Sequence, residues 1–311
     1  MARALTCPSC HKTTYQDVEN CPHCGTPFVG SVHDLPGSDT IPHAAGEQAF
    51  SVSACLLKTA AVVFRNFVPF VGIALLITAP VILIELVFDV PARYDALLQF
   101  INTLLSYLAM VAITYGTITD LRGHQTGIVH SLTNAAPSAL SALGVGLLSG
   151  LMIMIVFVFS VMVAMTLTRA MAIPDGHPLS IVLMMVASIP GLIVFSMYWT
   201  AIPVRVVENL GIIKSLSRSK RLSEGERGKI LAVFFVVFSV AMLPFFILFM
   251  TAVDDAAGAL ENGVTMSFQI GLYLVSAVSM VILSVAAAVT YHDLRLGKEG
   301  EGTENTAEIF E

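Results

Sequence analysis

The sequence predicts an all-α polytopic membrane protein. Its six transmembrane helices are expected to form three repeated hairpins with interfacial amphipathic helices, preceded by a small N-terminal zinc ribbon. Three observations lead to this fold class: six long apolar runs, a strong asymmetry of positive charge, and two CxxC pairs near the N-terminus. Of the 311 residues, 56% are hydrophobic and only 12% are charged. Soluble domains carry about 25% charged residues, so the composition indicates that lipid is the main solvent.

Composition divides the chain into four regions. Residues 1–29 are polar and contain paired cysteines, and they form the predicted zinc ribbon. Residues 30–50 mix Gly, Pro, Ser, Asp and His without an apolar period, which predicts a flexible linker. Residues 51–297 contain the long apolar runs of the membrane domain, and residues 298–311 form an acidic tail that we expect to be disordered. The N-terminus has no apolar h-region, so we expect the first span to act as its own targeting signal.

Six runs are long enough to cross a bilayer, which requires about 20 apolar residues. Backbone polar groups in lipid must be satisfied within their own segment, so each run is predicted to be a helix. The predicted spans are 67–88, 96–119, 140–167, 179–204, 230–253 and 266–291. Pro190 and Gly191 predict a kink in the fourth span. Glu85 is the only Asp, Glu, Lys or Arg within the spans. It either marks a transport pathway or simply reaches the interface near the outer end of the first span.

The distribution of Lys and Arg predicts the orientation. If the N-terminus is cytoplasmic, the inside segments are 1–66, 120–139, 205–229 and 292–311. Of the 16 Lys and Arg residues in the chain, only Arg93 and Arg169 then lie outside. The sequence therefore predicts a multi-pass membrane protein with both termini and the ribbon in the cytoplasm.

An internal repeat accompanies the spans. Residues 127–135 read GIVHSLTNA and residues 211–219 read GIIKSLSRS, while CLLKTAAVV at 55–63 is a weaker counterpart. These segments are predicted to be interfacial helices that precede the odd-numbered spans. Three copies of one unit with the same orientation would pack around a pseudo-threefold axis along the membrane normal.

The predicted interfacial helices are amphipathic. In 53–67, an apolar stripe that includes Leu56 and Val63 lies beside a face with Lys58 and Arg65. Such a helix lies in the headgroup layer with its basic side toward anionic lipid. In 207–222 the predicted anionic-lipid contacts are Lys214, Arg218, Lys220 and Arg221. The alternative is that these charges only enforce topology. Cys55 is expected to be structural or a palmitoylation site.

Acidic and arginine residues recur at the ends of the even-numbered spans. Residues 117–123 read TITDLRG, residues 290–297 read TYHDLRLG, and residues 204–211 read VRVVENLG. We predict a ring of ion pairs that closes the cytoplasmic side, formed by Asp120, Arg122, Arg205, Glu208, Asp293 and Arg295. The alternative is that these residues are separate interfacial anchors beside aromatic side chains.

Two CxxC pairs predict a structural zinc site. Its four ligands are Cys7, Cys10, Cys21 and Cys24, and ten residues separate the pairs. Four thiolates complete the tetrahedral coordination that Zn²⁺ prefers, which leaves no open catalytic position. Metal binding would supply the folding energy of so short a segment. The segment has little basic charge, which argues against nucleic-acid binding and favours a protein partner.

The stretch from Ile189 to Lys229, with AIPVRVVENLGIIKSLSRSKRLSEGERGKI, and the later YHDLRLGKEG carry a family resemblance. They resemble the membrane domain attached to some glycerophosphoryl diester phosphodiesterases and are similar to the related YciC-like bacterial membrane proteins. The resemblance implies a polytopic helical bundle. The phosphodiesterase catalytic domain has no counterpart here, so its activity is not carried over.

No catalytic motif is present: HExxH, GxSxG and a Walker A loop are all missing from the sequence. The predicted function is therefore that of a non-enzymatic membrane scaffold or regulatory accessory protein, with the ribbon as a cytoplasmic docking module. The alternative is a transporter or lipid-handling protein that uses the bundle interior. A tightly packed apolar interior favours the first, and a polar cavity that reaches the midplane favours the second.

Overall fold

The computed structural model describes residues 5–6, 13–14, 50–88, 91–124, 127–174, 177–254 and 266–300. The chain forms two compact units, Met1–Glu47 and Gln48–Glu311. In the first unit, strand β1 (Leu5–Thr6) pairs antiparallel with β2 (Thr13–Thr14). The four predicted zinc ligands, almost all of the predicted linker and residues 301–311 lie outside the described residues.

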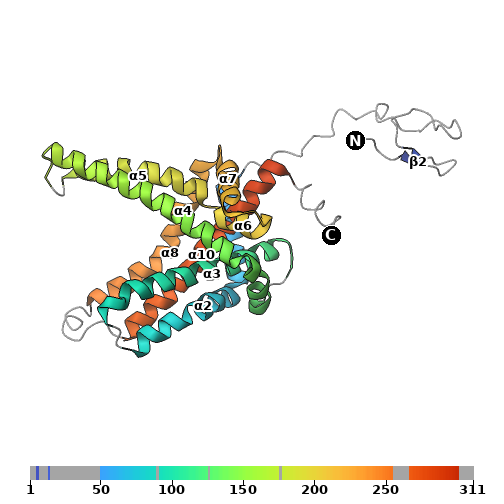
Figure 1. Ribbon diagram of the computed structural model, residues 1–311, viewed down its shortest axis with the longest axis horizontal. Coiled ribbons are helices and arrows are strands. Elements are labelled where there is room, and N and C mark those ends of the chain that lie inside the picture. The colour runs from blue at the N-terminus through green and yellow to red at the C-terminus, as the bar shows by residue number, and fades with distance from the viewer. Residues whose placement is uncertain are drawn as a thin grey trace. The chain divides into compact units, whose positions relative to one another are not determined.

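The described part of the second unit is helical (Figure 1). Its elements are α1 (Val52–Arg65), α2 (Phe67–Val87), the short 3-10 helix η2 (Ala92–Tyr94), α3 (Asp95–Leu121), α4 (Ile128–Ala170), α5 (Pro178–Tyr198), α6 (Ala201–Glu208), α7 (Ile212–Ser223), α8 (Arg227–Asp254) and α10 (Met266–Glu299). We call the end that carries α1, α6 and α7 the basal end. The distal end is the opposite one, where α2 connects to α3, α4 to α5 and α8 to α10.

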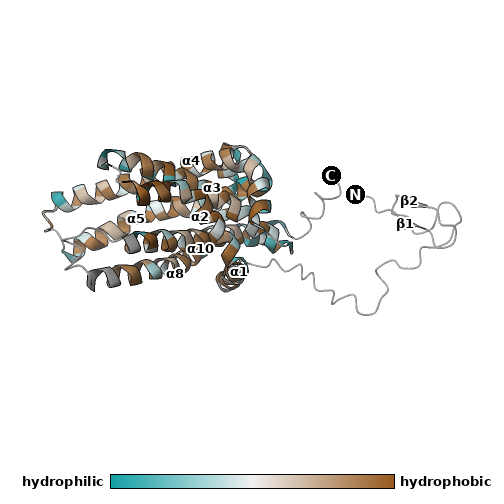
Figure 2. Cartoon of the chain, turned by 90° about the horizontal axis from the view of Figure 1, so that it is seen from below, coloured by the Kyte–Doolittle hydropathy of each residue, from teal (hydrophilic) through white to brown (hydrophobic). Residues whose placement is uncertain are grey.

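Six helical segments are long and apolar enough to cross a membrane, as the sequence predicts. They are Phe67–Val87, Asp95–Leu121, Ile128–Ala170, Pro178–Glu208, Arg227–Met250 and Phe268–Glu299. Figure 2 shows that apolar residues follow these helices over most of their length, while hydrophilic residues gather near their ends. The predicted tail begins later than expected, because α10 continues through Lys298 to Glu299.

Proline explains where the fourth predicted span is interrupted. Helix α5 continues through Pro190, and the break lies instead at Trp199 and Thr200, before α6. Pro203, near the start of α6, has no backbone N–H to donate to the carbonyl of Trp199, and its ring crowds that carbonyl. The chain therefore starts a new helix there.

The second predicted interfacial helix is not a separate element, which corrects the sequence analysis. Residues 127–135 begin α4, a single helix of 43 residues. At 1.5 Å per residue such a helix is about 64 Å long, roughly twice the thickness of the hydrocarbon core. No residue comparable to Asn66, which separates α1 from α2, interrupts it. Pro137 lies inside the helix but does not end it.

Helix α10 is the central element of the unit and packs against α1, α2, α3 and α8. Helices α4 and α5 form a hairpin, and α4 packs on α3. In Figure 1 the end of the hairpin where α4 connects to α5 diverges from α2, α3, α8 and α10. The apolar core is densest in the basal half of the bundle. There Phe70, Ile73, Ile113, Val281 and Val285 are fully buried.

Candidate functional site

The distal half of the bundle contains a cavity of about 750 Å³ between α2, α3, α8 and α10. Its polar lining residues are Thr78, Gln99, Asn102, Ser106, Gln269, Tyr273, Ser276 and Ser279. Apolar walls are provided by Ile82, Met242, Phe245, Phe268, Leu272, Ala277, Met280 and Leu283. The volume lies in the range of about 300–1,000 Å³ that is typical of small-molecule sites.

The polar lining follows from helical spacing. On α3, Gln99, Asn102 and Ser106 are three and four residues apart and share one face. On α10, Gln269, Tyr273 and Ser276 are spaced in the same way. On α10 the lining runs from Phe268 to Leu283, which are 15 residues apart, or about 22 Å of helical rise. The cavity therefore extends over more than half of a hydrocarbon core of roughly 30 Å.

A second cavity of about 570 Å³ adjoins the first at the distal end, and the two share Gln99, Gln269 and Tyr273. Its lining adds two carboxylates, Glu85 and Asp95. The hydroxyl of Tyr273 donates a hydrogen bond to the Glu85 carboxylate, which connects α10 to the last turn of α2. Glu85 thus lies at the mouth of a cavity.

The cavity is closed toward the basal end. Thr78 and Leu283 are among its deepest lining residues, and the buried side chains of Phe70, Ile73 and Val281 lie in the core on the basal side of them. Ser279 is nearly buried and donates to the backbone oxygen of Ala241 at 2.7 Å, which holds α10 against α8. The unit is hollow in its distal half and packed in its basal half.

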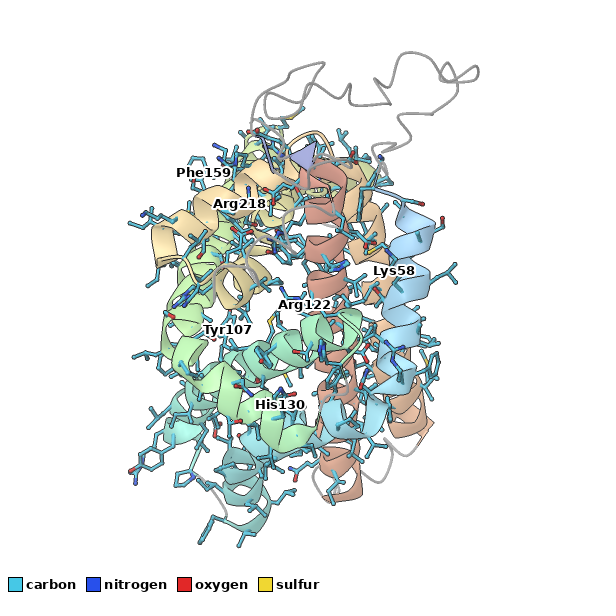
Figure 3. All side chains as sticks on the ribbon, turned by 90° about the vertical axis from the view of Figure 1, so that its right-hand side faces the viewer. Lys58, Tyr107, Arg122, His130, Phe159 and Arg218 are labelled. Carbon is cyan, nitrogen blue, oxygen red and sulfur yellow. The ribbon has the colours of Figure 1, made fainter. Side chains whose placement is uncertain are left out.

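Ion pairs from α1 hold the ends of α3 and α10 together. Lys58 Nζ donates to Asp293 Oδ1 at 2.7 Å, and Arg65 pairs with Asp120. Figure 3 shows Lys58 on α1, which lies beside α10. Both carboxylates are nearly buried, with relative side-chain exposures of 9% and 8%, whereas the basic partners are more exposed. Helix α1 therefore connects the first hairpin to the last.

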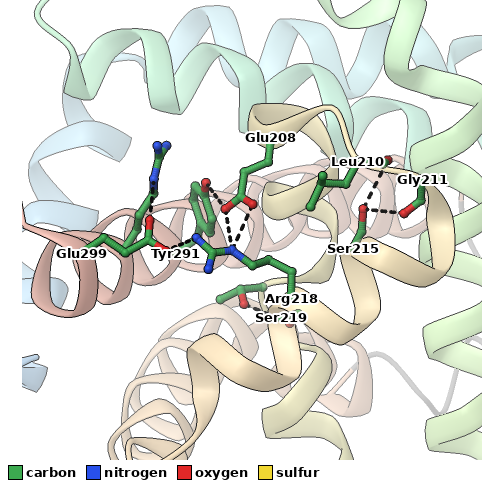
Figure 4. A network of polar contacts seen from close by, with 10 residues as sticks. Glu208, Leu210, Gly211, Ser215, Arg218, Ser219, Tyr291 and Glu299 are labelled. Carbon is green, nitrogen blue, oxygen red and sulfur yellow. Dashed lines mark hydrogen bonds and ion pairs between the residues drawn. The ribbon is translucent and has the colours of Figure 1, made fainter. Parts of the chain in front are cut away.

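Arg218 of α7 joins a second set of carboxylates at the basal end (Figure 4). Its Nε donates to Glu208 Oε2 at 3.0 Å, and it also pairs with Glu299. Tyr291 donates to Glu208 Oε1 at 3.0 Å, and Arg295 Nε lies 3.4 Å from Glu299. Burial opposes the charge on Arg218, but its hydrogen bonds with Glu299 and Glu208 raise the pKa of its guanidinium above the ordinary value.

Only part of the predicted ring comes together in these networks. Glu208 and Arg295 are linked through Arg218 and Glu299, whereas Asp120 and Asp293 pair with α1. Arg205 donates to Ser141 Oγ at 2.9 Å and to Asn209 Oδ1 at 2.6 Å. Arg122 caps the C-terminus of α3. The bases on α1 and α7 were the partners that the sequence analysis missed.

Helix α1 faces the opposite way from the expectation. Lys58 and Arg65 point to carboxylates of the protein, and the exposed stripe is apolar, with Leu57 and Phe64 as its large members. The reason is that each nearly buried carboxylate at a helix end requires a positive partner. The exposed apolar stripe of α1, and not its basic face, is therefore the side that can enter lipid.

The residues predicted to contact anionic lipid divide into two groups. Lys214, Lys220 and Arg221 are exposed on α7. Arg218 is engaged by Glu208 and Glu299 and has only 14% of its side chain exposed, which is a correction to its predicted role. The buried face of α7 carries Ser215 and Ser219, and Ser219 donates to the backbone oxygen of Met197 at 2.8 Å.

Cys55 is fully buried, with Sγ 3.6 Å from Thr290 Oγ1 of α10. Burial raises the pKa of this thiol to about 11. A neutral, enclosed thiol is a poor nucleophile, which favours the structural interpretation over palmitoylation in the folded protein.

Equivalent positions of the three repeated segments have the same burial. Leu57, Val129 and Ile213 are 72%, 74% and 77% exposed, respectively. Two residues further along, Thr59, Ser131 and Ser215 are all buried. Both strong copies begin after a glycine in extended conformation, Gly127 and Gly211.

Six long apolar helices define a multi-pass helical membrane protein, and four of them, α2, α3, α8 and α10, line a cavity of ligand size. Within the part of the chain that the structure describes, no group of His, Cys, Asp and Glu residues is arranged to hold a metal ion. The chain matches no protein-family model, no curated protein and no solved structure. The resemblance to phosphodiesterase-linked and YciC-like membrane domains therefore stays a prediction.

Proposed function

We propose that this chain is a non-enzymatic membrane protein that binds a small amphipathic molecule or lipid in its distal cavity and acts in its transport or handling. The observation that carries the proposal is the polar lining of a cavity of about 750 Å³ that extends to the middle of the spans. Thr78, Tyr273, Ser276 and Ser279 donate hydrogen bonds within the protein. The side chains of Gln99, Asn102, Ser106 and Gln269 would be costly to place beside lipid chains alone, whereas a polar or amphipathic occupant, or water, satisfies them.

The packed basal half supports a one-sided cavity. The fully buried Phe70, Ile73 and Ile113 leave no path through this half, and the ion pairs of α1 and α7 lie beyond them. A transporter needs such a barrier in each of its states, and a lipid-handling protein needs a closed floor. The same geometry serves both, so transport and lipid handling stay joined in this proposal.

Accessibility of the cavity to water tests the proposal. Ser276 lines it, and Ser188 lies on α5, which contributes no lining residue. Each serine is ten residues from the start of its helix, so Ser276→Cys and Ser188→Cys place a thiol at matched depth. We expect a permanently charged methanethiosulfonate reagent to label the Ser276→Cys protein in nanodiscs and to leave position 188 unlabelled, as measured by peptide mass spectrometry. Equal protection of both thiols would refute a water-accessible cavity.

A second candidate is a membrane scaffold or regulatory accessory protein with a cytoplasmic zinc-ribbon docking module. The packed basal half is the feature that favours it. The zinc ribbon rests on the two CxxC pairs of the sequence, Cys7 with Cys10 and Cys21 with Cys24. We expect about one Zn²⁺ per chain by elemental analysis, lost in Cys7→Ser/Cys10→Ser. Loss of a bound protein partner on deletion of residues 1–30 would establish docking, and unchanged partners would refute it.

The topology belongs to the same proposal. The basal end holds α7 with its exposed Lys214, Lys220 and Arg221, which supports a cytoplasmic basal end in a prokaryotic plasma membrane and contact with anionic lipid. The matching burial of Leu57, Val129 and Ile213 supports three copies of one hairpin unit. A reporter fused after Glu311 that proved accessible only from outside the cell would contradict this topology.

A further inference from the structure

We infer that the ligand of the distal cavity is a lipophilic cation, with its positive group at the mouth and its apolar body toward the middle of the spans. The inference rests on the proposed binding function and specifies the charge class of its ligand.

The charge at the distal mouth of the cavity indicates the charge of the ligand. Glu85 and Asp95 line it, and no Lys or Arg contributes to the lining of either cavity. The nearest base in the sequence, Arg93, lies over the ring of Tyr94 at 4.8 Å from its centroid. Asp95 is in the first turn of α3, where a negative charge interacts favourably with the helix dipole. Two carboxylates beside low-dielectric walls attract a positive group and repel a negative one.

The connecting sequence adds an independent observation. Helices α8 and α10 both line the cavity, and residues 254–265 connect them. This connection contains Asp254, Asp255 and Glu261 and neither Lys nor Arg. The sequence that joins these two helices is therefore acidic, as is the mouth of the cavity.

The deep walls select the rest of the ligand. Met242, Phe245, Met280 and Leu283 are apolar and polarisable, and the polar groups between them are uncharged amides and hydroxyls. Methionine and aromatic side chains adapt to apolar groups of irregular shape and interact favourably with organic cations. A small inorganic cation would leave these walls without a partner.

Two probes of the same shape and opposite charge test the inference: tetraphenylphosphonium and tetraphenylborate. Binding to the purified full-length protein in nanodiscs is measured by equilibrium dialysis. Both probes also partition into lipid, so cavity binding is defined as the part lost in Ser276→Trp and retained in Ser188→Trp. We expect cavity binding of the cation and none of the anion. We expect Glu85→Gln to weaken the cation roughly tenfold. The matched control is Glu224→Gln, at the exposed C-cap of α7 outside both cavities, and it should leave the affinity unchanged.

The possible results separate the two levels of the proposal. The charge assignment is overturned if tetraphenylborate binds the cavity at least as strongly as the cation and Glu85→Gln has no effect. The binding function would then still stand. Loss of the phosphonium signal in Glu85→Gln but not in Glu224→Gln supports the assignment. If neither probe shows a component that Ser276→Trp removes, while position 276 is also closed to the thiol reagent, the binding function itself fails.

Discussion

Lys58 and Asp293 join the first interfacial helix to the last span, with Nζ of the lysine 2.7 Å from a carboxylate oxygen of the aspartate. The aspartate is nearly buried and the lysine is half exposed, so the pair neutralises a carboxylate that water reaches poorly. His292 Nδ1 lies 3.5 Å from the same oxygen. Asp293 thus pairs with α1 and not with another member of the ring that the sequence analysis predicted.

Charge exchange tests that partner. We expect Lys58→Asp and Asp293→Lys each to lower the thermal unfolding temperature, because each brings like charges together, and the double variant Lys58→Asp/Asp293→Lys to recover most of the loss. The measurement is thermal unfolding of the purified protein in detergent. Recovery of Asp293→Lys by Arg122→Asp instead would restore the predicted ring and contradict the pairing with α1.

Arg218 is expected to stabilise the basal end more than any neighbouring exposed base on α7. Arg218→Ala removes the partner of both Glu208 and Glu299 and should reduce the free energy of unfolding by about 2 kcal/mol, as for hydrogen bonds to charged groups. The matched control is Lys220→Ala on the same helix, whose exposed side chain should matter by less than about 0.5 kcal/mol. Equal effects of the two substitutions would show that the network contributes nothing beyond surface charge.

The Cys55 thiol should be unreactive in the folded protein. Its pKa is raised from 9.0 to about 11 by burial, so the folded state keeps the proton that the unfolded state loses near pH 9. The contribution of the Cys55 thiol to the free energy of unfolding is therefore complete below pH 9. It is lost as the pH rises through about 11, which lowers the free energy of unfolding by up to roughly 2–3 kcal/mol. The measurement is alkylation of Cys55 at pH 8 and at pH 10, with the modified cysteine identified by peptide mapping.

Two outcomes are distinguished in that experiment. We expect no modification of Cys55 in the native state at pH 8 and complete modification in denaturing detergent. Rapid native-state alkylation at pH 8 would show that α1 separates from α10 and that Thr290 does not cover the thiol.

Gly146 allows α3 and α4 to approach. A Cβ at this position would lie 2.7 Å from ring carbons of Tyr107, so Gly146→Ala should destabilise the protein by about 1–3 kcal/mol. Gly228 on α8 has no atom near its equivalent position, and Gly228→Ala should be neutral or stabilising by up to about 1 kcal/mol. Thermal unfolding of both variants compares crowding with helix propensity. A stable Gly146→Ala protein would mean that Tyr107 can move without cost.

The six spans could be predicted from the sequence because length and apolarity suffice for a helix in lipid. The continuity of α4 could not, since the internal repeat suggested a separate interfacial helix over residues 127–135. The predicted orientation of α1, with its basic face toward lipid, was wrong for a related reason. Amphipathic spacing shows that Lys58 and Arg65 share a face, but it does not show that Asp120 and Asp293 lie opposite that face.

Part of the polar lining of the cavity can be recognised in the sequence. Gln99, Asn102 and Ser106 recur at helical spacing inside an apolar span, and so do Gln269, Tyr273 and Ser276. The pattern predicts a polar face on each helix. It does not reveal that these two faces meet across empty space rather than through interhelical hydrogen bonds, because that depends on the packing of four helices at once.

The contacts of α1 also order the events of biosynthesis. Cys55 and Lys58 leave the ribosome early, yet each finds its partner on α10 only 235 residues later. Until the last segment inserts, α1 can rest on the membrane surface by its apolar stripe while its lysine stays solvated. The bundle can therefore close only after α10 has been inserted and has docked beside α1.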